Sequence, residues 1–347
     1  MDVPAAGSID RVLESPGPVL LLGAADTGKT ALMARLARAF RAAGRPAAAL
    51  DLDVGQSEIG PPGLIDLAEA DAEAPPAKWR ARGQWYVGST TPFGAPTAIA
   101  VGARRLLDRA TELDLGPVVV DTPSFVNAPA GHALAQSLID ALRPRLIVAI
   151  QLGAEMEPFL KGVGAPVERM AMDPAVRSKP SGLRSARRAA RLDAYFRDAR
   201  EHSIRLPEWA LRGTRLGFGD PLAPAECASA ANLLGCPVRH GERSSSSVAL
   251  WTLGQPRYDP ARAGAELRAS RLATFDAAAW EHRSAGFIAP DGFCVAMGVI
   301  ERVDWASLTA TVYAPLYSVA DAVAISLGLM RHNRDGSGLP PVADRDA

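Results

Sequence analysis

Lysine and cysteine are scarce in this chain of 347 residues. Only four of its 38 basic residues are lysines, and the other 34 are arginines. The three cysteines are odd in number and lack the spacing of a metal-binding motif, so the sequence indicates neither a disulfide framework nor a zinc site. We expect Cys227, Cys236 and Cys294 to be core residues.

An excess of charge of one sign is also missing. The 38 basic residues balance 38 acidic ones, which argues against a protein that coats nucleic acid through a general basic field. No apolar run is long enough to span a membrane, and residues 1–8 lack the basic-then-apolar pattern of a signal peptide. We therefore expect a cytoplasmic enzyme that needs no membrane partner.

What the chain does have is an alternation of buried strands and helices. Four short apolar runs are typical of strands, namely 19–22, 47–52, 118–120 and 146–150. Most are separated by helical patterns, at 31–43, 97–112 and 132–142. This order predicts an α/β domain with a doubly wound, mainly parallel sheet of the P-loop NTPase type, whose ligands bind at the carboxyl ends of the strands.

The composition changes after Pro207. Short apolar stretches interrupted by glycine and proline predict a smaller β-rich domain over 206–331, with strands near 293–299 and 309–313. The first domain would then cover residues 1–205, and the polar tail 332–347 is expected to be disordered. We find no catalytic constellation in the second domain.

The strongest motif follows the first apolar run. Residues 23–30 read G-x-x-x-x-G-K-T directly after Val19–Leu22, which is the context of a phosphate-binding P-loop. Its backbone N–H groups and the start of the next helix would bind ATP, with Lys29 on the outer phosphates and Thr30 on magnesium. The residues assigned to ATP are Gly23, Ala24, Ala25, Asp26, Thr27, Gly28, Lys29, Thr30 and Ala31.

A second motif, D-L-D-V-G-Q, spans Asp51 to Gln56 at the end of the second strand. A carboxylate there can hold magnesium or accept the proton of an attacking hydroxyl, and Asp53 is placed to do so. Gln56 could orient a phosphate or a water. The alternative is that Asp51 and Asp53 only cap the following turn.

Asp121 is a competing carboxylate. It ends the third apolar run and is followed by Thr122, in the form of a Walker B strand, so both are expected to face the nucleotide or the acceptor unless they are structural. The glycine of a D-x-x-G element is replaced by Ser124, and no N-K-x-D tetrapeptide occurs. A GTPase is therefore not indicated.

Two further segments could bind phosphates. The turn Gly88–Pro92 offers the hydroxyls of Thr90 and Thr91, although its composition is also that of an ordinary loop. The segment 177–200 carries eight basic residues against two acidic ones, so its net charge is 8 − 2 = +6. Four arginines would share one helical face there: Arg184, Arg187, Arg188 and Arg191.

Like charges at this spacing destabilise a helix by about 0.2–0.5 kcal/mol per pair, so an anionic partner is the natural reason to keep them. A solvated basic face is the alternative interpretation. Pro180 and Gly182 could serve as hinges, and we interpret residues 177–200 as a mobile arginine lid.

Together these motifs resemble the polynucleotide 5′-hydroxyl kinases related to the mRNA cleavage-complex RNA kinase and the ribosomal-RNA-processing kinases. The resemblance lies in the order and spacing of G-x-x-x-x-G-K-T, D-L-D-V-G-Q, G-S-T-T-P and the arginine lid, and covers most of residues 15–200. It implies ATP and Mg²⁺ as cofactors and a single-stranded or end-exposed 5′-hydroxyl polynucleotide as partner, with RNA favoured.

The resemblance also assigns roles. Lys29, Asp53, Arg184 and Arg188 would be catalytic, and Thr30 and Asp53 would bind the metal. Acceptor contacts would come from Gln56, Thr90, Thr91, Thr122, Phe125, Arg177, Arg187 and Arg191.

Two departures from the family pattern matter. Phe125 stands where the larger relatives have a tryptophan that stacks on the first base, so its smaller ring would change affinity or base preference. The separate N-terminal domain of the eukaryotic relatives has no counterpart before the P-loop, so docking into their multi-protein complexes is not implied, nor is another protein partner.

Our interpretation is an ATP-dependent polynucleotide 5′-hydroxyl kinase. Two rivals stay open at this stage. A small-molecule P-loop kinase would phosphorylate a free nucleoside or sugar, and an ATP-dependent switch or assembly factor would hydrolyse ATP with a vestigial acceptor site.

Overall fold

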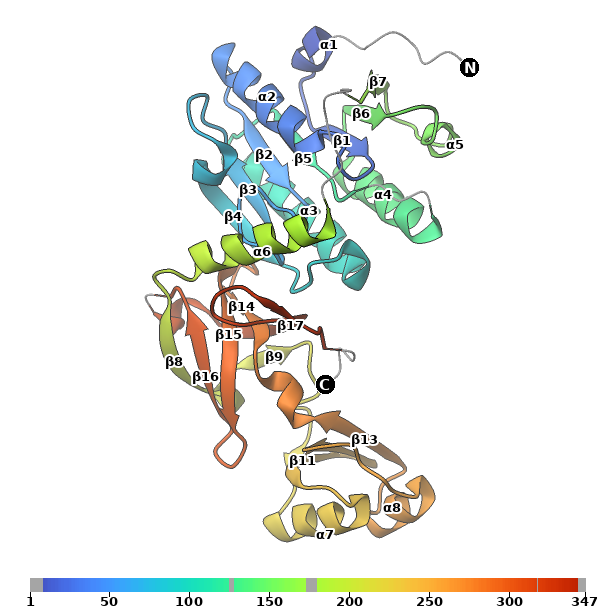
Figure 1. The fold of residues 1–347 in the computed structure, drawn as a ribbon, viewed down its shortest axis with the longest axis vertical. Helices are drawn as coiled ribbons and strands as arrows, with labels where there is room; N and C mark the ends of the chain where they lie inside the picture. The colour runs from blue at the N-terminus through green and yellow to red at the C-terminus, as the bar shows by residue number, and fades with distance from the viewer. Residues whose placement is uncertain (1–8, 125–127, 173–179, 317, 343–347) are drawn as a thin grey trace. The chain divides into compact units, whose positions relative to one another are not determined.

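The computed structural model describes residues 9–124, 128–172, 180–316 and 318–342 (Figure 1). The chain divides into two compact units, Met1–Leu192 and Asp193–Ala347. This boundary lies before residue 205, where the sequence placed it, because the strand β8 (Arg200–Arg205) pairs with β16 (Thr309–Ala314) of the second unit. None of the described helices is long and apolar enough to cross a membrane.

The first unit contains the strands β1 (Val19–Gly23), β2 (Ala48–Asp51), β3 (Leu64–Glu69), β4 (Arg80–Tyr86), β5 (Val118–Asp121), β6 (Leu146–Gln151) and β7 (Val167–Ala171). Its helices are α1 (Ile9–Leu13), α2 (Lys29–Ala42), α3 (Pro96–Glu112), α4 (Pro129–Leu142), α5 (Glu157–Leu160) and α6 (Ser181–Tyr195), the last of which ends in the second unit. Two short 3-10 turns are η1 (Pro76–Lys78) and η2 (Pro92–Gly94). All four predicted strands and all three predicted helices are present.

These strands form one sheet in the order β4-β3-β2-β5-β1-β6-β7. The strands β2, β5, β1, β6 and β7 pair in parallel, whereas β3 runs antiparallel to both β2 and β4. Since β4 therefore runs in the same direction as β2, every strand except β3 ends at the same edge. The predicted doubly wound, mainly parallel sheet is confirmed.

The helices bury their apolar faces on both sides of this sheet. Leu36 and Phe40 of α2 are fully buried in one cluster with Val19 and Leu21 of β1. Because side chains alternate along a strand, the equally buried Leu20 points to the opposite face. On that face α3 packs against β2, β3, β4 and α4.

The second unit is built from two sheets. One has the order β18-β17-β14-β15-β16-β8, with β9 on the side of β17, and the other has the order β10-β11-β12-β13. Its further strands are β9 (Ala210–Arg212), β10 (Asp220–Pro221), β11 (Val238–Ser244), β12 (Ser247–Thr252), β13 (Arg271–Asp276), β14 (Arg283–Ile288), β15 (Cys294–Asp304), β17 (Ala324–His332) and β18 (Gly338–Leu339). Its helices and turns are α7 (Pro224–Leu234), α8 (Pro260–Glu266), η3 (Leu206–Glu208), η4 (Ala277–Trp280) and η5 (Val319–Asp321).

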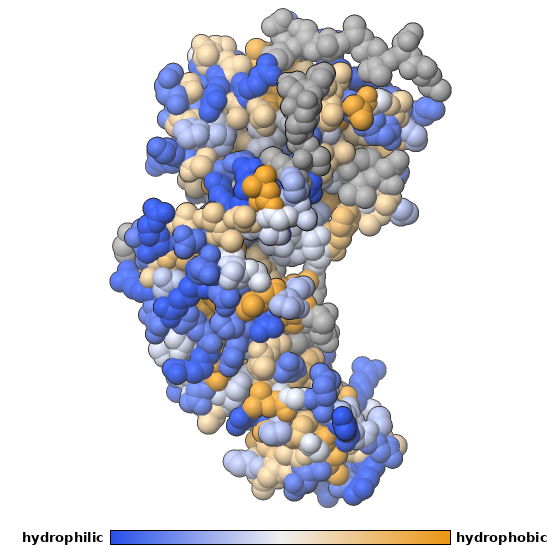
Figure 2. Space-filling view, viewed as in Figure 1, coloured by the Kyte–Doolittle hydropathy of each residue, from blue (hydrophilic) through white to orange (hydrophobic). Residues whose placement is uncertain are grey.

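The main core of the second unit contains Trp251, Trp280 and Phe287. The expectation that the tail is disordered does not hold as far as residue 342, because β18 pairs with β17 and Val342 is buried in that core. Hydrophilic and hydrophobic residues are interspersed over the face of the molecule shown in Figure 2.

Replacing Phe40 with alanine tests the packing that holds α2 on the sheet. Phe40 is fully buried, so Phe40→Ala is expected to lower the free energy of unfolding by about 3–5 kcal/mol. Phe93→Ala is the matched control, because Phe93 is 43% exposed and should lose less than about 1 kcal/mol. Urea unfolding followed by circular dichroism measures both, and equal losses would contradict this packing.

Candidate nucleotide and acceptor site

Four loops meet at the edge of the first sheet where the parallel strands end. They follow β1, β2, β4 and β5 (Figure 1). The first three carry the P-loop, the D-L-D-V-G-Q motif and the G-S-T-T-P turn, and the fourth comes directly after Asp121, the last residue of β5. Ligands of open α/β sheets bind at this edge. The sheet topology thus brings together motifs that lie up to a hundred residues apart in the sequence.

The P-loop has the conformation that phosphate binding requires. Gly28 adopts a left-handed φ of 91° and precedes α2, whose first turn has no side-chain cap. A Cβ on Gly23 would lie 2.6 Å from Thr27 Oγ1 and 2.8 Å from the carbonyl oxygen of Ile150. Glycine is therefore needed at both positions, and the uncapped N–H groups of α2 are available to an anion.

Lys29 lies folded over the P-loop. Its Nζ donates hydrogen bonds to the carbonyl oxygens of Gly23 at 2.9 Å and Ala24 at 2.7 Å. The side chain is buried, and burial lowers the pKa of Lys29 despite the neighbouring charge of Asp121. The ammonium group is thus held at the position from which it can reach a bound phosphate.

Thr30 and Asp121 form the pair that fits a metal. The Thr30 hydroxyl donates to Asp121 Oδ2 at 2.5 Å, while Asp121 Oδ1 is buried without a hydrogen-bond partner among the described residues. Burial, together with the charge of Asp51, raises the pKa of Asp121. A hydroxyl and an unsatisfied carboxylate oxygen are ligands that Mg²⁺ accepts, with phosphate and water completing its shell.

The described residues contain no group of three or more His, Cys, Asp or Glu side chains that could hold a metal alone. The protein therefore offers part of a coordination shell, as Mg²⁺ sites that use substrate phosphates do.

Asp51 organises the loop after β2. This buried carboxylate accepts hydrogen bonds from the N–H of Asp53 at 3.0 Å and from the Ser57 hydroxyl at 2.9 Å. It also accepts from the N–H groups of Glu58 and Ile59, at 2.8 Å and 3.3 Å. The interpretation of Asp51 as a turn cap agrees with these contacts, and the loop 52–59 is fixed around it.

Asp53 both caps and lines the site. Its Oδ1 accepts from the N–H groups of Gly55 and Gln56, each at 3.0 Å, so any further ligand must use Oδ2. The Gln56 amide donates to the carbonyl oxygens of Gly55 at 2.7 Å and Arg184 at 3.3 Å. Gln56 therefore links the loop to the arginine helix.

The G-S-T-T-P turn packs against this loop. A Cβ on Gly55 would lie 2.7 Å from the carbonyl oxygen of Thr90. The buried Ser89 hydroxyl accepts from the N–H of Thr91 and donates to its carbonyl oxygen, which fixes the turn. Thr90 is half-buried beside the D-L-D-V-G-Q loop, whereas the Thr91 side chain is exposed.

Among the predicted acceptor residues, the side chain of Thr122 does not face the site in the described structure. Thr122 is buried and its hydroxyl donates to the carbonyl oxygen of Leu21 at 2.7 Å, so this side chain serves the sheet. Phe125 and Arg177 lie outside the described residues.

The predicted arginine helix is α6, and its arginines contact acidic partners that the sequence did not single out. Arg184 pairs with Asp26 of the P-loop at 2.7 Å, and Arg187 pairs with Glu58 at 2.6 Å. Arg191 donates to the carbonyl oxygen of Gly60 at 3.3 Å. No periodicity marks Asp26 or Glu58 as such partners, because the contacts join segments far apart in the chain.

Two hollows lie between these elements. The larger, named here the phosphate pocket, has a volume of about 580 Å³ and is lined by Ala25, Asp26, Thr27, Gly28, Lys29, Thr30, Ala31, Ala34, Arg35, Arg38, Asp53, Gln56, Glu58, Pro76, Ser124 and Arg184. The smaller, named here the lid pocket, is lined by Gly55, Gln56, Ser57, Glu58, Pro62, Arg187, Arg188 and Arg191. One pocket thus joins the P-loop, Asp53 and Arg184 of α6.

Buried carboxylates form a row beneath the site. Asp66, Asp51 and Asp121 are register partners on the neighbouring strands β3, β2 and β5. Asp66 accepts from the Gln84 amide at 2.6 Å, and its Oδ2 has no hydrogen-bond partner among the described residues. Burial raises the pKa of Asp66 to about 7. Nothing in the sequence distinguishes Asp66 from an exposed strand residue.

Comparisons with known proteins found a family model, relatives and solved structures that are similar to this chain. A family model described as the P-loop of the mRNA cleavage and polyadenylation factor CLP1 matches residues 23–198. The polyribonucleotide 5′-hydroxyl-kinase of Pyrococcus abyssi is 25% identical over 336 residues, 96% of this chain and 93% of the relative. The enzyme of that name from Methanocaldococcus jannaschii is 23% identical over 345 residues, with coverage of 96% and 92%.

Among solved structures, the wild-type Clp1p–Pcf11p complex matches with a TM-score of 0.60 and 13% identity. The match covers 93% of this chain and 77% of the solved one. At this identity the likeness concerns the fold alone, and it extends over both units.

Asp66→Asn tests the buried carboxylate row. A carboxyl group whose pKa is raised on folding favours the folded state below the pKa of the unfolded chain, and this contribution is lost as the pH rises through about 7. Asp66→Asn should therefore become more stable than the wild type between about pH 5 and about pH 8, by on the order of 2–4 kcal/mol.

Unfolding midpoints measured across this pH range check the prediction. Asp108→Asn is the control, because its pairing with Arg104 lowers the pKa of Asp108, so the carboxyl is charged in both the folded and the unfolded state from about pH 5 to about pH 8. The stability difference between Asp108→Asn and the wild type should therefore stay constant over this range. A pH profile of Asp66→Asn that parallels the wild type would contradict the assignment.

Proposed function

The chain belongs to the CLP1 P-loop family, and we propose that it is an ATP-dependent kinase that transfers the γ-phosphoryl group to the 5′-hydroxyl end of a polynucleotide, with RNA preferred. The observation that carries this proposal is the phosphate pocket, which Lys29, Asp53 and Arg184 line together. A phosphoryl transferase needs a phosphate cradle, an acceptor-aligning carboxylate and cationic groups around one reaction centre. The names of the archaeal relatives, polyribonucleotide 5′-hydroxyl-kinases, support the choice of acceptor.

The P-loop N–H groups and Lys29 bind the phosphates in this proposal. Lys29 exchanges its hydrogen bonds to the carbonyl oxygens of Gly23 and Ala24 for phosphate oxygens. The groups that would hold Mg²⁺ are the Thr30 hydroxyl and Asp121, with Asp53 on the acceptor side. A bound Mg²⁺ would neutralise charge on the phosphate oxygens.

Asp53 aligns the acceptor. Because its Oδ1 caps the turn, Oδ2 is the oxygen that accepts the hydrogen bond of the 5′-hydroxyl and receives its proton. Gln56, Thr90, Arg187 and Arg191 lie on the acceptor side, at the loop and lid that flank Asp53. Their contacts would be to phosphates, so binding should depend on salt rather than on base sequence.

The lid arginines act on the transferring group. Arg184 leaves Asp26 for the γ-phosphoryl oxygens, and Arg188, which lines the lid pocket one helical turn further on, joins it. Guanidinium groups at this position stabilise the charge that develops in the transition state.

A transfer assay tests the proposed function. Purified protein with ATP labelled at the γ-phosphate, magnesium and matched 5′-hydroxyl RNA and DNA oligonucleotides should place label on the 5′ end, more on RNA. Lys29→Ala and Asp53→Asn should abolish it, since one removes the phosphate cation and the other the aligning charge. Asp53→Asn retains an oxygen that can cap the turn, so its melting temperature should stay near that of the wild type.

Other results of this assay would support one of the two alternative functions. Label on free nucleosides that does not depend on oligonucleotide length would identify a small-molecule kinase. Turnover of ATP without end label would identify a switch.

Substitution of the lid arginines distinguishes a role in stabilising the transition state from a role in binding ATP. Arg184→Ala and Arg188→Ala are expected to lower kcat by at least about 100-fold with smaller changes in the KM for ATP, because the contacts form in the transition state. Arg262→Ala is the control, since Arg262 is exposed on α8 and pairs with Glu266. A loss of kcat no greater than that of the control would contradict the lid assignment.

A further inference from the structure

The phosphate pocket extends past the residues that ATP phosphates need. Its wall continues along α2 through Ala34, Arg35 and Arg38, and reaches Pro76 of η1. Arg38 follows Thr30 by eight residues, which is about 12 Å along a helix that rises 1.5 Å per residue. This flank of α2 therefore has room for a ligand beyond the triphosphate chain.

The extension lies on the acceptor side of the site. Its lining comes from the loop after β2, which carries Asp53, Gln56 and Glu58, and from the loop after β3, which carries Pro76. In the sheet order, β2 and β3 lie on one side of β1 and β6 lies on the other. The loop after β6 contributes no residue to the described lining. The pocket thus continues from Asp53 away from β6 and along α2, towards the opposite edge of the sheet, where the antiparallel β3 ends and the loop with Pro76 begins.

The charged residues that line the pocket differ between its two ends. Near the P-loop, acidic and basic side chains form pairs, whereas the described extension along α2 carries only basic ones. The acidic residues of the lining are engaged: Asp26 pairs with Arg184, Glu58 pairs with Arg187, and Asp53 caps its turn. Beyond them the charged residues that line the pocket are Arg35 and Arg38. This end therefore suits an anion.

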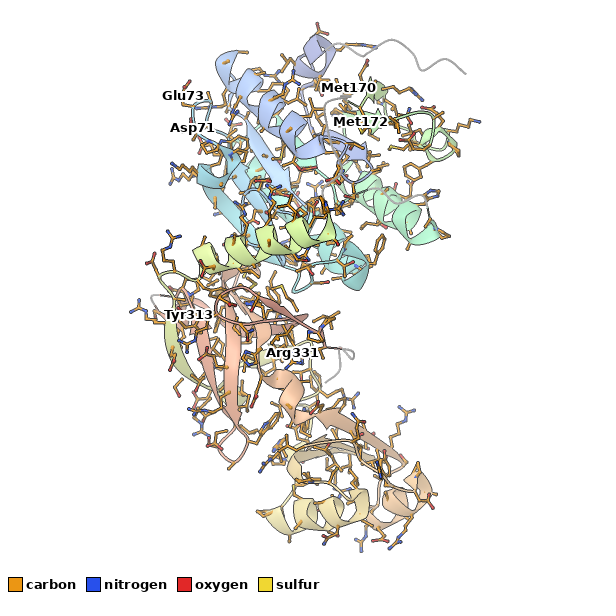
Figure 3. All side chains as sticks on the ribbon, in the orientation of Figure 1. Asp71, Glu73, Met170, Met172, Tyr313 and Arg331 are labelled. Carbon is orange, nitrogen blue, oxygen red and sulfur yellow. The ribbon has the colours of Figure 1, made fainter. Side chains whose placement is uncertain are left out.

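Arg38 carries a donor that lacks an acceptor. Its Nη2 donates to the carbonyl oxygen of Ala74 at 3.1 Å, while its Nε is buried without a hydrogen-bond partner among the described residues. Asp71 and Glu73 project from the same loop (Figure 3) but do not line the pocket. Asp71 instead accepts hydrogen bonds from the N–H groups of Glu73 and Ala74. An N–H in a pocket wall favours a ligand oxygen, above all a charged one.

We infer that Arg35 and Arg38 form a subsite for a phosphodiester group of the acceptor strand, downstream from the reacting 5′ end. The inference rests on the proposed kinase function and deepens it. Phosphates of one strand are about 3.4 Å apart along a duplex axis, so the flank of α2 from Thr30 to Arg38, about 12 Å long, is longer than one nucleotide step. A contact to phosphate is indifferent to base identity and makes recognition depend on acceptor length.

The experiment compares acceptors of increasing length. Arg35→Ala, Arg38→Ala and Arg38→Lys are assayed on a nucleoside 3′-monophosphate, a dinucleotide and a decamer RNA, all with a 5′-hydroxyl. The alanine variants should raise the KM for the decamer about 5- to 10-fold, leave kcat and the KM for ATP unchanged, and leave the KM for the monophosphate unchanged. The salt dependence of decamer binding should weaken by a slope of about 0.7 for each lost phosphate contact.

Arg41→Ala is the matched control, because Arg41 is exposed on the last turn of the same helix and does not line the pocket. It should leave the KM for the decamer unchanged. Arg38→Lys retains the charge, so it should show a smaller defect than Arg38→Ala and covers the case in which Arg38→Ala fails to fold.

Two kinetic outcomes would overturn the inference. A rise in the KM for ATP that is equal for all acceptors would assign these arginines to the nucleotide. An unchanged KM for every substrate would remove them from recognition altogether.

Binding of a decamer RNA labelled at its 3′ end, followed by fluorescence anisotropy, separates this inference from the kinase proposal. If the wild type transfers no label yet binds the decamer, and both alanine variants lose that affinity while Arg41→Ala keeps it, the subsite stands and the kinase function fails. If the alanine variants bind the decamer as the wild type does, the subsite is wrong whatever the kinase result.

Discussion

The proposed acceptor side of the site depends on the burial of one carboxylate. Asp51 ends β2 between Asp66 and Asp121, out of contact with water, and its oxygens accept hydrogen bonds from four donors of the following loop. A buried polar group destabilises the fold unless it forms hydrogen bonds. The Asp51 carboxylate forms its hydrogen bonds only while the following loop keeps this conformation. The positions of Asp53, Gln56 and Glu58 follow from that constraint, since all three belong to the same loop.

At the edge where the parallel strands end, the loops after β1 and β2 form the two sides of the site, the proposed nucleotide side and the proposed acceptor side. The P-loop follows β1, and Asp121 is the last residue of β5, which pairs with both β1 and β2. On the proposed nucleotide side, the Thr30–Asp121 hydrogen bond connects the start of α2 to the end of β5. On the proposed acceptor side, the close approach of Gly55 to Thr90 connects the loop after β2 to the turn after β4. The helix α6 then links the two, because Arg184 contacts Asp26 while Arg187 contacts Glu58. The contacts that hold these loops together are all within the protein, so the site does not need a ligand to form.

The sequence predicted the parts of this design that depend on local pattern. Apolar runs and helical periodicity located β1, β2, β5, β6 and the helices α2 to α4, and the glycines of the P-loop identified its function. β3 and β4 were missed, because β3 carries the buried Asp66 and β4 begins with R-A-R, neither of which reads as an apolar run.

Long-range contacts could not be predicted in the same way. The order of the sheet, the inward turn of Thr122 and the partners of Arg184 and Arg187 depend on which strands become neighbours. The hydrophobic pattern specifies each element but leaves the pairing of elements to the packed chain. The extension of the pocket along α2 belongs to the same class, since it needs the loop after β3 to lie beside Arg38.

The carboxylates that hold the lid arginines also bear on which anions can occupy the site. Arg184 and Arg187 are each within 3 Å of an acidic oxygen, so a ligand must compete with Asp26 and Glu58 for them. A small anion such as chloride or free phosphate would exchange one ion pair for another and gain little. A ligand that presents several phosphate oxygens along the whole pocket replaces both pairs at once. Competition with Asp26 and Glu58 therefore favours a ligand with several phosphate groups over a single small anion.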